Sequence, residues 1–302
     1  MTGPSAVVIA DSTCEGSVRL TTMEIRFHRF ILPQLNSHRV FSRNSSSSRA
    51  IPVSRQLANL GDQRAAPLSW PAEKRGMQGG LALEDPTEAQ AIWHDLGKVA
   101  TEAAEALQAT GLHKSVTNRV LEPFMWHTSV VTSTAWGNFF LQRDSELAQP
   151  EVRALAQAMA VALAGSTPRQ LRAGEWHLPY VSERDAGLAD SPFDDQPDLL
   201  PRISAARCAR TSYLTHDGRS DPSADLKLFD KLISADPPHW SPLEHVATPW
   251  PENRAQGELR FTDRHGARQE LPLTHLPRVG NLLGWRSLRT EVEAAQGART
   301  FT

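Results

Sequence analysis

The spacing of apolar residues along this chain changes from a strand period to a helix period, which limits the folds open to it. Residues 18–27 alternate between polar and apolar, as in a strand with one buried face. The residues of that inner face are Met23, Ile25 and Phe27. Apolar residues recur at helical spacing over 88–110 and 150–165, so both strands and amphipathic helices are expected.

The two long helices have predicted boundaries and buried faces. Gly111 is expected to cap the first helix, and the second is expected to begin at Pro150 and end at Gly165. The first apolar stripe comprises Ile92, Leu96, Val99, Ala103 and Leu107. The second comprises Val152, Leu155, Met159 and Leu163.

Shorter elements are expected between and beyond these helices. A helix is predicted from about Pro33 to Phe41, with a loop after it. Another is predicted over 223–236, with Ser223 as its N-cap and an inner face of Leu226, Phe229, Leu232 and Ile233. Residues 258–262 are a strand candidate, whereas 51–90 and 166–202 are rich in Pro, Gly or Asp and are expected to be irregular.

Composition excludes several classes of protein. The 302 residues carry a net charge of −2, which does not suit a general nucleic-acid binder. No apolar stretch is long enough to span a bilayer, and the first residues lack the basic start of a signal peptide. Cys14 and Cys208 permit one disulfide at most, so a reducing cytoplasm is the expected location.

Motifs of several common sites are missing from the sequence. The eleven histidines form no HExxH motif or zinc-type cluster, and His239 and His245 are separated by Pro242, so no metal site is expected. Cys208 could be a nucleophile, but a free cysteine is more often packed in the interior. No GxGxxG or Walker loop supports a dinucleotide or P-loop site.

Residues 37–50, SHRVFSRNSSSSRA, combine arginines with serines directly after a predicted core segment. A serine-rich run is usually a solvated linker, but guanidinium and hydroxyl groups also suit a phosphate. The arginine candidates for an anion site are Arg39, Arg49, Arg119 and Arg143. For each arginine taken alone, pairing with a surface acid such as Glu122, Asp144 or Glu146 is the simpler interpretation.

Taken together, three blocks resemble the flavin-dependent thymidylate synthases, the ThyX family. The run SHRVFSRNSSSSR is similar to the family signature RHRxxSxNxxSxRY. The segment 118–153, NRVLEPFMWHTSVVTSTAWGNFFLQRDSELAQPEVR, resembles a second family block, although Glu122 splits its Leu-Pro pair. ISAARCARTSYLTHDG and HWSPLEHVATP, within 203–249, resemble the block that opens most family members. The resemblance covers about 20–50, 113–165 and 203–247.

The order of these blocks differs from that of the family, because HWSPLEH follows the signature instead of preceding it. The chain therefore looks circularly permuted, which a fold tolerates where its termini lie close together on the surface. The resemblance implies an α+β ThyX-like fold, with a central antiparallel sheet flanked by helices. We expect one catalytic domain over 1–302, with an N-terminal tail at 1–17 and a C-terminal extension at 250–302.

The resemblance also implies roles for particular residues. FAD would contact His38, Arg39, Asn44, Asn138, His239, Ser241 and Glu244. A dUMP-like nucleotide would be held by Gln34, Ser47, Arg49, Arg119 and Arg143. Of these, Arg49 and Arg119 suit the phosphate, while Arg143 and Ser47 are the expected catalytic residues, with Arg143 facing the pyrimidine.

The implied reaction is reductive C5-methylation of dUMP or UMP. In this family NADPH reduces FAD, methylene-tetrahydrofolate supplies the carbon, and the sites lie at the interfaces of a homotetramer. Permuted relatives occur in phages, and a related uridylate methylase serves polyoxin-type antibiotic pathways. Ser37, Ser45 and Ala50 replace the usual Arg, acidic residue and Tyr, and these smaller residues leave room for UMP. No nucleic-acid polymer or membrane partner is expected.

Two alternatives remain open from the sequence. The departures at Ser37 and Ala50 are compatible with a homologue that binds flavin or nucleotide without turnover. A protein of another class, with a Ser/Arg loop serving as a docking or modification site, would bind no flavin.

Overall fold

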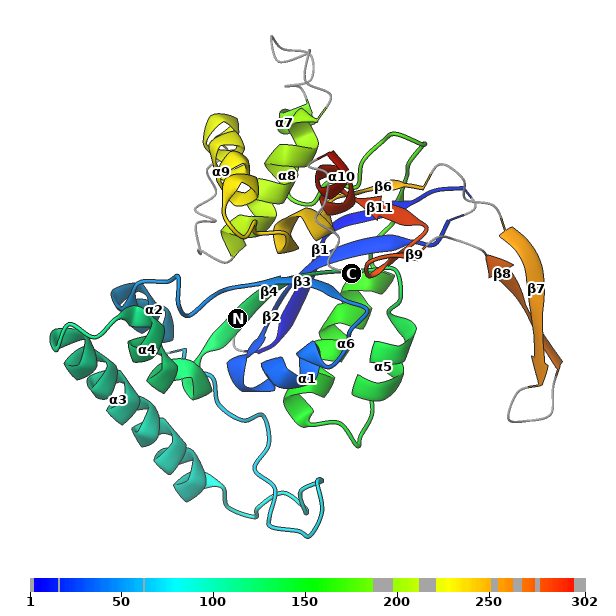
Figure 1. Cartoon of the computed structure of the whole chain (residues 1–302). Helices are drawn as coiled ribbons and strands as arrows, with labels where there is room; N and C mark the ends of the chain where they lie inside the picture. Colours follow the sequence, from blue (N-terminus) through cyan, green and yellow to red (C-terminus); the bar gives the residue numbers. More distant parts are fainter. Residues whose placement is uncertain are drawn as a thin grey trace.

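The computed structural model describes residues 3–15, 17–61, 63–186, 198–211, 221–250, 255–262, 268–274 and 278–295. A five-stranded sheet lies at its centre, in the order β3-β4-β2-β1-β5 (Figure 1). Its strands are β1 (Ser5–Thr13), β2 (Leu20–His28), β3 (Ser42–Ser45), β4 (Trp126–Ser133) and β5 (Arg169–Gln170). Neighbouring strands are antiparallel except β1 and β5, so the expected α+β fold with a mainly antiparallel sheet is confirmed.

One face of the sheet is apolar and packs on helices. Met23, Ile25 and Phe27 project from β2 into a core in which each is fully buried, as the alternation predicts. The helices of this layer are α1 (Leu32–Asn36), α5 (Gly137–Arg143) and α6 (Pro150–Ala164). The predicted stripe of α6 is confirmed, because Val152, Leu155 and Met159 are fully buried there.

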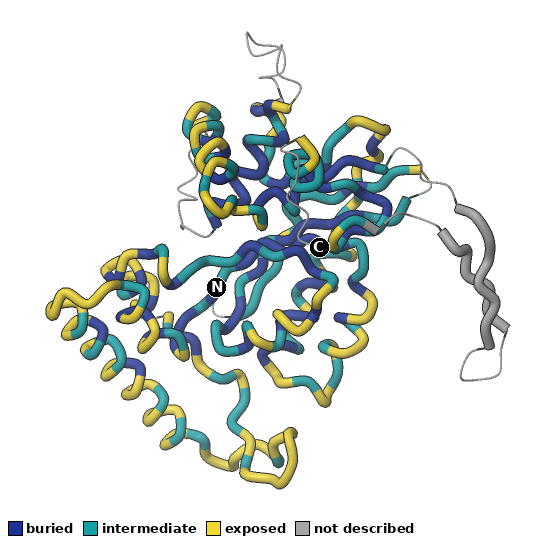
Figure 2. Tube along the Cα trace, viewed as in Figure 1, coloured by how far each residue is buried: buried dark blue, intermediate teal, exposed yellow. Residues whose placement is uncertain are grey.

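The other face of the sheet carries a second layer, built from late parts of the chain (Figures 1 and 2). Its helical elements are α7 (Glu183–Ala186), α8 (Leu199–Arg210), α9 (Pro222–Ser234), η5 (Ser241–His245) and α10 (Leu288–Ala295). Its short strands are β6 (Ala247–Pro249), β9 (Arg278–Val279), β10 (Leu282–Leu283) and β11 (Trp285–Ser287). Trp285 is fully buried against Leu20 and Ala247, so part of the expected C-terminal extension belongs to the core.

A buried arginine holds three helices of this second layer together. The guanidinium of Arg207 on α8 donates to both carboxylate oxygens of Asp185 on α7, at 2.7 and 2.8 Å. Its Nε donates to Asp225 on α9 at 2.9 Å. The hydrogen bonds from Arg207 hold the pKa of Asp185 well below its usual range, so the pair stays ionised.

A third group of helices lies beside the N-terminal end of β4. It consists of α2 (Val53–Leu60), α3 (Thr87–Ala109), α4 (Lys114–Thr117) and η2 (Asn118–Phe124), with a small core of its own. The bounds predicted for α3 are confirmed, and Gly111 follows it with φ of +84°. The predicted buried face of α3 is wrong, because Ile92, Leu96 and Val99 are 55%, 52% and 58% exposed. The side that packs inward instead carries Trp93, Gly97, Ala100 and Ala104.

Other sequence predictions need correction. The helix expected to Phe41 ends at Asn36, and the expected loop includes the strand β3. The range 51–90, expected to be irregular, contains the helix α2, and Pro52 does not interrupt this helix because it stands at the N-cap. The cap of α9 is Asp221, whose side chain accepts from the amide of Ala224 at 3.1 Å, instead of Ser223.

One expected terminal tail is a strand, and one expected strand is confirmed. Residues 5–13, expected within a tail, form β1 and pair with β2. The strand candidate at 258–262 lies in β7 (Ala255–Thr262), which pairs with β8 (Arg268–Thr274). No helix in the described ranges is long and apolar enough to cross a bilayer.

A buried chain of polar groups joins the sheet to the second layer. His177 is hydrogen-bonded to Ser12 on β1 at 2.8 Å and to Thr22 on β2 at 2.7 Å. Thr22 contacts Thr132 on β4 at 2.7 Å, and Thr132 contacts Nδ1 of His245 at 2.8 Å. All five side chains are buried, so these groups give one another the hydrogen-bond partners that water would otherwise provide.

This polar chain predicts a pH-dependent stability. Burial lowers the pKa of His177, His245 and the buried His127 to about 3, compared with 6.5 in an unfolded chain. Between pH 3 and pH 6.5 the unfolded chain binds more protons than the folded chain. The stabilisation from these neutral histidines is therefore fully present above pH 6.5, and the free energy of unfolding decreases as the pH falls towards 3. We expect each histidine to contribute a decrease of about 1.4 kcal/mol per pH unit in that window.

Urea denaturation at pH 7.5, 6.0 and 5.0 measures this decrease. His177→Asn is expected to have a shallower pH dependence than the unmodified protein, whereas the exposed His94→Asn is expected to match it. Equal pH dependence in all three proteins would contradict the assignment.

Candidate functional site

A cavity of about 500 Å³ lies where β3 and the loop after it meet η5, α8 and α9. Five residues that the resemblance assigned to ligands line it: Asn44, Ser47, Arg49, His239 and Ser241. The other lining residues are Ala50, His113, Ser115, Ala209, Leu232 and Pro242. Among the described residues no Asp or Glu lines this cavity, and its polar lining suits an anionic ligand.

Asn44 connects the signature to the late part of the chain. It is the third residue of β3, and its side chain points towards the second layer. Its Nδ2 donates to the carbonyl of Cys208 on α8 at 2.6 Å, and its Oδ1 accepts from Ser241 Oγ at 3.3 Å. The two blocks, 197 residues apart in sequence for Asn44 and Ser241, therefore form one wall.

Arg49 supplies the positive charge of this cavity. It is exposed and makes no ion pair with an acidic residue in the described part of the chain. Ser47 lies two residues before it, half-buried and on the same cavity wall. An unpaired guanidinium beside a hydroxyl is an arrangement that binds phosphate or carboxylate oxygens.

A second group of assigned residues lies at α1 and α5. Arg143 Nε donates to His38 Nε2 at 2.9 Å, and its Nη2 donates to Ser37 Oγ at 3.1 Å. Burial, and then the cations of Arg143 and Arg43, lower the pKa of His38, so its imidazole is neutral and can accept this bond. Gln34, also on α1, donates to Gln149.

The cavity and the α1–α5 group lie on opposite faces of β3. Arg43 donates to the carbonyls of Leu35 and His38, at 3.2 and 3.0 Å, whereas its neighbour Asn44 points towards α8. Successive side chains of a strand point to opposite faces. Within one chain, the group around Arg143 is therefore separated from the Arg49 cavity by the sheet.

The other assigned residues have individual surroundings. Arg39 and Asn138 are exposed. Glu244 accepts from Arg289 at 2.6 Å. Arg119 donates to Glu122 at 2.8 Å, so the simpler pairing interpretation is confirmed for this arginine. It is wrong for Arg143, whose described hydrogen bonds go to His38 and Ser37.

Two cavity residues were not found by sequence reasoning. His113 caps α4 by accepting from the amide of Ser115 at 3.2 Å, and both residues line the cavity. Histidine is not among the residues preferred at an N-cap, so no sequence motif marked either residue.

Cys208 is not placed to act as a nucleophile. It is fully buried on α8, and burial raises the pKa of its thiol far above its usual value. Cys14 and Cys208 are both free thiols. Among the described residues, no group of three His, Cys, Asp or Glu side chains could hold a metal ion.

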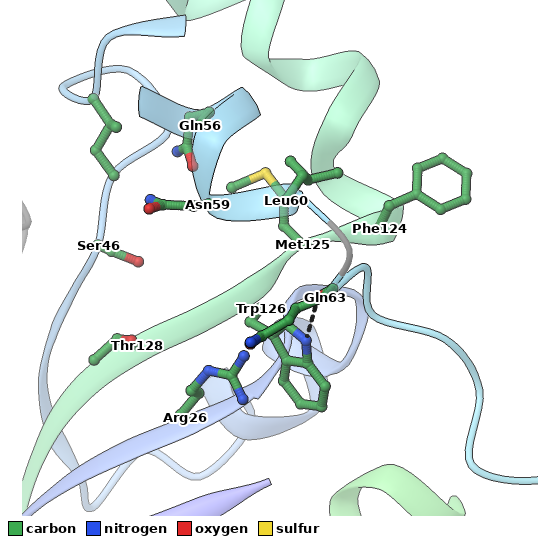
Figure 3. A pocket seen from close by; sticks show the side chains of 11 residues that line it. Arg26, Ser46, Gln56, Asn59, Leu60, Gln63, Phe124, Met125, Trp126 and Thr128 are labelled. Atoms are coloured by element: carbon green, nitrogen blue, oxygen red, sulfur yellow. Dashed lines mark hydrogen bonds between the residues drawn. The ribbon is translucent and has the colours of Figure 1, made fainter. Parts of the chain in front are cut away.

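A smaller cavity of about 250 Å³ lies between α2 and the sheet (Figure 3). The Arg26 guanidinium lies 4.1 Å from the centre of the Trp126 ring, and Trp126 Nε1 donates to the carbonyl of Gln63 at 2.9 Å. Ser46 lines this cavity, whereas Ser47 lines the larger one. None of the residues assigned from the resemblance lines it.

A family model described as "Thymidylate synthase complementing protein" matches residues 18–169, half of the chain. A structure of the UMP/dUMP methylase PolB from Streptomyces cacaoi bound with 5-Br dUMP is 16% identical, with a TM-score of 0.42, over 54% of this chain and 91% of that chain. A second, bound with 5-Br UMP, is 16% identical with a TM-score of 0.44, over 54% and 90%. No curated protein matches the chain.

The contacts of Asn44 predict a specific loss of stability. Asn44→Asp replaces the donor to the Cys208 carbonyl with a carboxylate oxygen in a buried position. We expect the free energy of unfolding at pH 7.5 to fall by about 2–3 kcal/mol, measured by urea denaturation. The exposed Asn59→Asp is the matched control, expected within about 0.5 kcal/mol of the unmodified protein. Equal stability of the two variants would contradict the role of Asn44.

Proposed function

Because the chain belongs to the family of thymidylate synthase complementing proteins, we propose that it catalyses the reductive C5-methylation of a uridine 5′-monophosphate. The substrate is dUMP or UMP, methylene-tetrahydrofolate donates the carbon, and NADPH reduces the flavin. The observation that carries the proposal is the cavity that joins Asn44, Ser47 and Arg49 of the signature to His239 and Ser241 of the late block.

The nucleotide is the anionic ligand of this proposal. Arg49 and Ser47 bind its phosphate from the cavity wall, whose described residues include no carboxylate that would compete for the guanidinium. Arg119 donates one N–H to Glu122 and retains other guanidinium donors for the phosphate. Arg143 lies against the pyrimidine and stabilises negative charge that develops on the ring, as expected of a fixed cation in a closed site. Gln34 is the remaining residue assigned to the nucleotide.

The polar residues of the cavity also fit a flavin cofactor. FAD, when bound, supplies the hydride. Asn44, His239 and Ser241 offer amide, imidazole and hydroxyl groups from the cavity wall, and Glu244, His38, Arg39 and Asn138 are proposed to complete the contacts. Cys208 is buried and takes no part, in agreement with a reaction that uses no cysteine nucleophile on the pyrimidine.

On this proposal a complete site is built from more than one copy of the chain. The group around Arg143 and the cavity with Arg49 lie on opposite faces of β3, which favours sites in which different copies contribute these two groups. The apolar row of α3, Ile92, Leu96 and Val99, is exposed and offers a surface for association. We propose a homotetramer with sites at subunit interfaces.

The circular permutation is part of the same proposal. The late block, 203–247, packs on β3 through the bonds of Asn44 to Cys208 and Ser241. That contact supports a site built from both blocks, although the late block follows the signature along the chain instead of preceding it.

A spectrum and two titrations test this function. Purified protein, with FAD added if necessary, is expected to absorb at about 450 nm as flavoproteins do. With NADPH and methylene-tetrahydrofolate it is expected to convert dUMP, UMP or both into the C5-methyl nucleotide. Because Ala50 lines the cavity and is smaller than the family tyrosine, UMP is expected to be accepted. A preference for dUMP of about a thousandfold would contradict this.

Arg49→Ala is the matching variant. Loss of a charge-assisted contact to phosphate is expected to weaken dUMP binding by roughly 10- to 100-fold in calorimetric titration. Arg75→Ala removes an exposed arginine elsewhere and is expected to change nothing. Protein that takes up flavin and nucleotide without turnover would indicate an inactive homologue, and protein that binds neither would overturn the proposal.

A further inference from the structure

The side chains of the loop at residues 46–51 face two different surroundings. Ser47 and Arg49 line the larger cavity, together with Ala50. Ser46 and Ser48 point the other way: Ser46 Oγ is hydrogen-bonded to His127 at 3.1 Å, and Ser48 is only 5% exposed. The orientation of the two cavity residues therefore depends on what holds the residues between them.

Three polar side chains of one helical stretch hold this loop from behind. Lys114 Nζ donates to the carbonyl of Ala50 at 2.7 Å. Asn118 Nδ2 donates to the carbonyls of Ser48 and Ile51, at 2.6 and 2.9 Å. These are bonds to loop backbone, which fix its path whatever side chains the loop carries.

Glu122 supplies the third contact from the same stretch. Its Oε1 accepts from Ser48 Oγ at 2.8 Å and is also bonded to Arg29 at 3.2 Å. Glu122 is the residue that splits the Leu-Pro pair of the family block, so the chain has placed a carboxylate where it reaches the loop.

These three residues reach the loop from two consecutive elements. Lys114 begins α4, Asn118 stands where α4 passes into the 3-10 helix η2, and Glu122 lies within η2. Their hydrogen bonds to residues 48–51 show that all three face the loop. Asn118 is fully buried, so its two bonds replace hydration that the loop carbonyls would otherwise need.

We propose that Lys114, Asn118 and Glu122 are positioning residues that hold the 46–51 loop with Ser47 and Arg49 facing the ligand. A preorganised loop binds more tightly, because the cost of ordering it is met before the ligand arrives. The inference rests on the proposed function for the identity of the ligand, dUMP. The ordering of the loop itself can be measured without any ligand.

Two variants remove single contacts without touching the cavity wall. Lys114→Met removes the bond to Ala50, and Ser48→Ala removes the bond to Glu122 without changing any charge. The amides of Ala50 and Ile51 donate to the carbonyl of Ser47, at 3.0 and 3.2 Å, and report loop order by hydrogen exchange. Lys98→Met removes an exposed lysine bonded to Asp95 and is the control.

In both variants we expect the Ala50 and Ile51 amides to exchange roughly tenfold faster and dUMP to bind about three- to tenfold more weakly, as expected for one lost hydrogen bond. In turnover assays the KM for dUMP is expected to rise by a similar factor, because Ser47 and Arg49 hold the phosphate. Lys114→Arg is expected to restore most of the loss, and Lys98→Met to match the unmodified protein.

Unchanged exchange at Ala50 and Ile51 in both variants would overturn the inference. Weaker dUMP binding in Lys114→Met with unchanged exchange would also overturn it, because the lysine would then act by its charge alone. If the unmodified protein binds no dUMP, the proposed function fails, while faster exchange in Ser48→Ala would still show that these contacts order the loop.

Discussion

The hydrogen bonds of the Asn44 side chain are the contact on which the arrangement of this molecule depends. They join a four-residue edge strand to a helix and a 3-10 turn from the last third of the chain. The sheet face on which they lie is polar, with Thr22 and Thr132 buried under the second layer. Since an unpaired polar group in such a position costs about as much as a lost hydrogen bond, the second layer must dock in one register.

The same contact brings the proposed ligand residues together. Asn44 is fixed by α8 and η5, and the following loop is held by α4 and η2, so the cavity wall between them has anchors on two sides. The pocket therefore combines a rigid frame with an exposed cation, Arg49, at its surface. This division suits a site that must hold an anion and release it again.

The sequence predicted well where periodicity and burial agree, as in β2 and α6. It failed on the face of α3 because two stripes compete: Ile92, Leu96 and Val99 share one spacing, and Trp93, Gly97 and Ala100 share the same spacing one residue later. Gly97 allows Phe124 and Arg64 to approach closely, a matter of shape that hydrophobicity does not record. The cavity residues of the signature were predicted from the family resemblance, whereas Lys114 and Asn118 belong to no motif and required the fold.

The late position of the second layer has a consequence for how the protein is made. Strands β1 to β4 and helix α6 are complete by residue 164, but the groups that cover their polar face, His177, Cys208 and Ser241, are synthesised afterwards. Without these groups Thr22, Thr132 and Asn44 lack their protein partners, and Leu20 on the same face lacks its cover of Ala247 and Trp285. This face of the sheet can therefore be buried completely only after synthesis has passed residue 285.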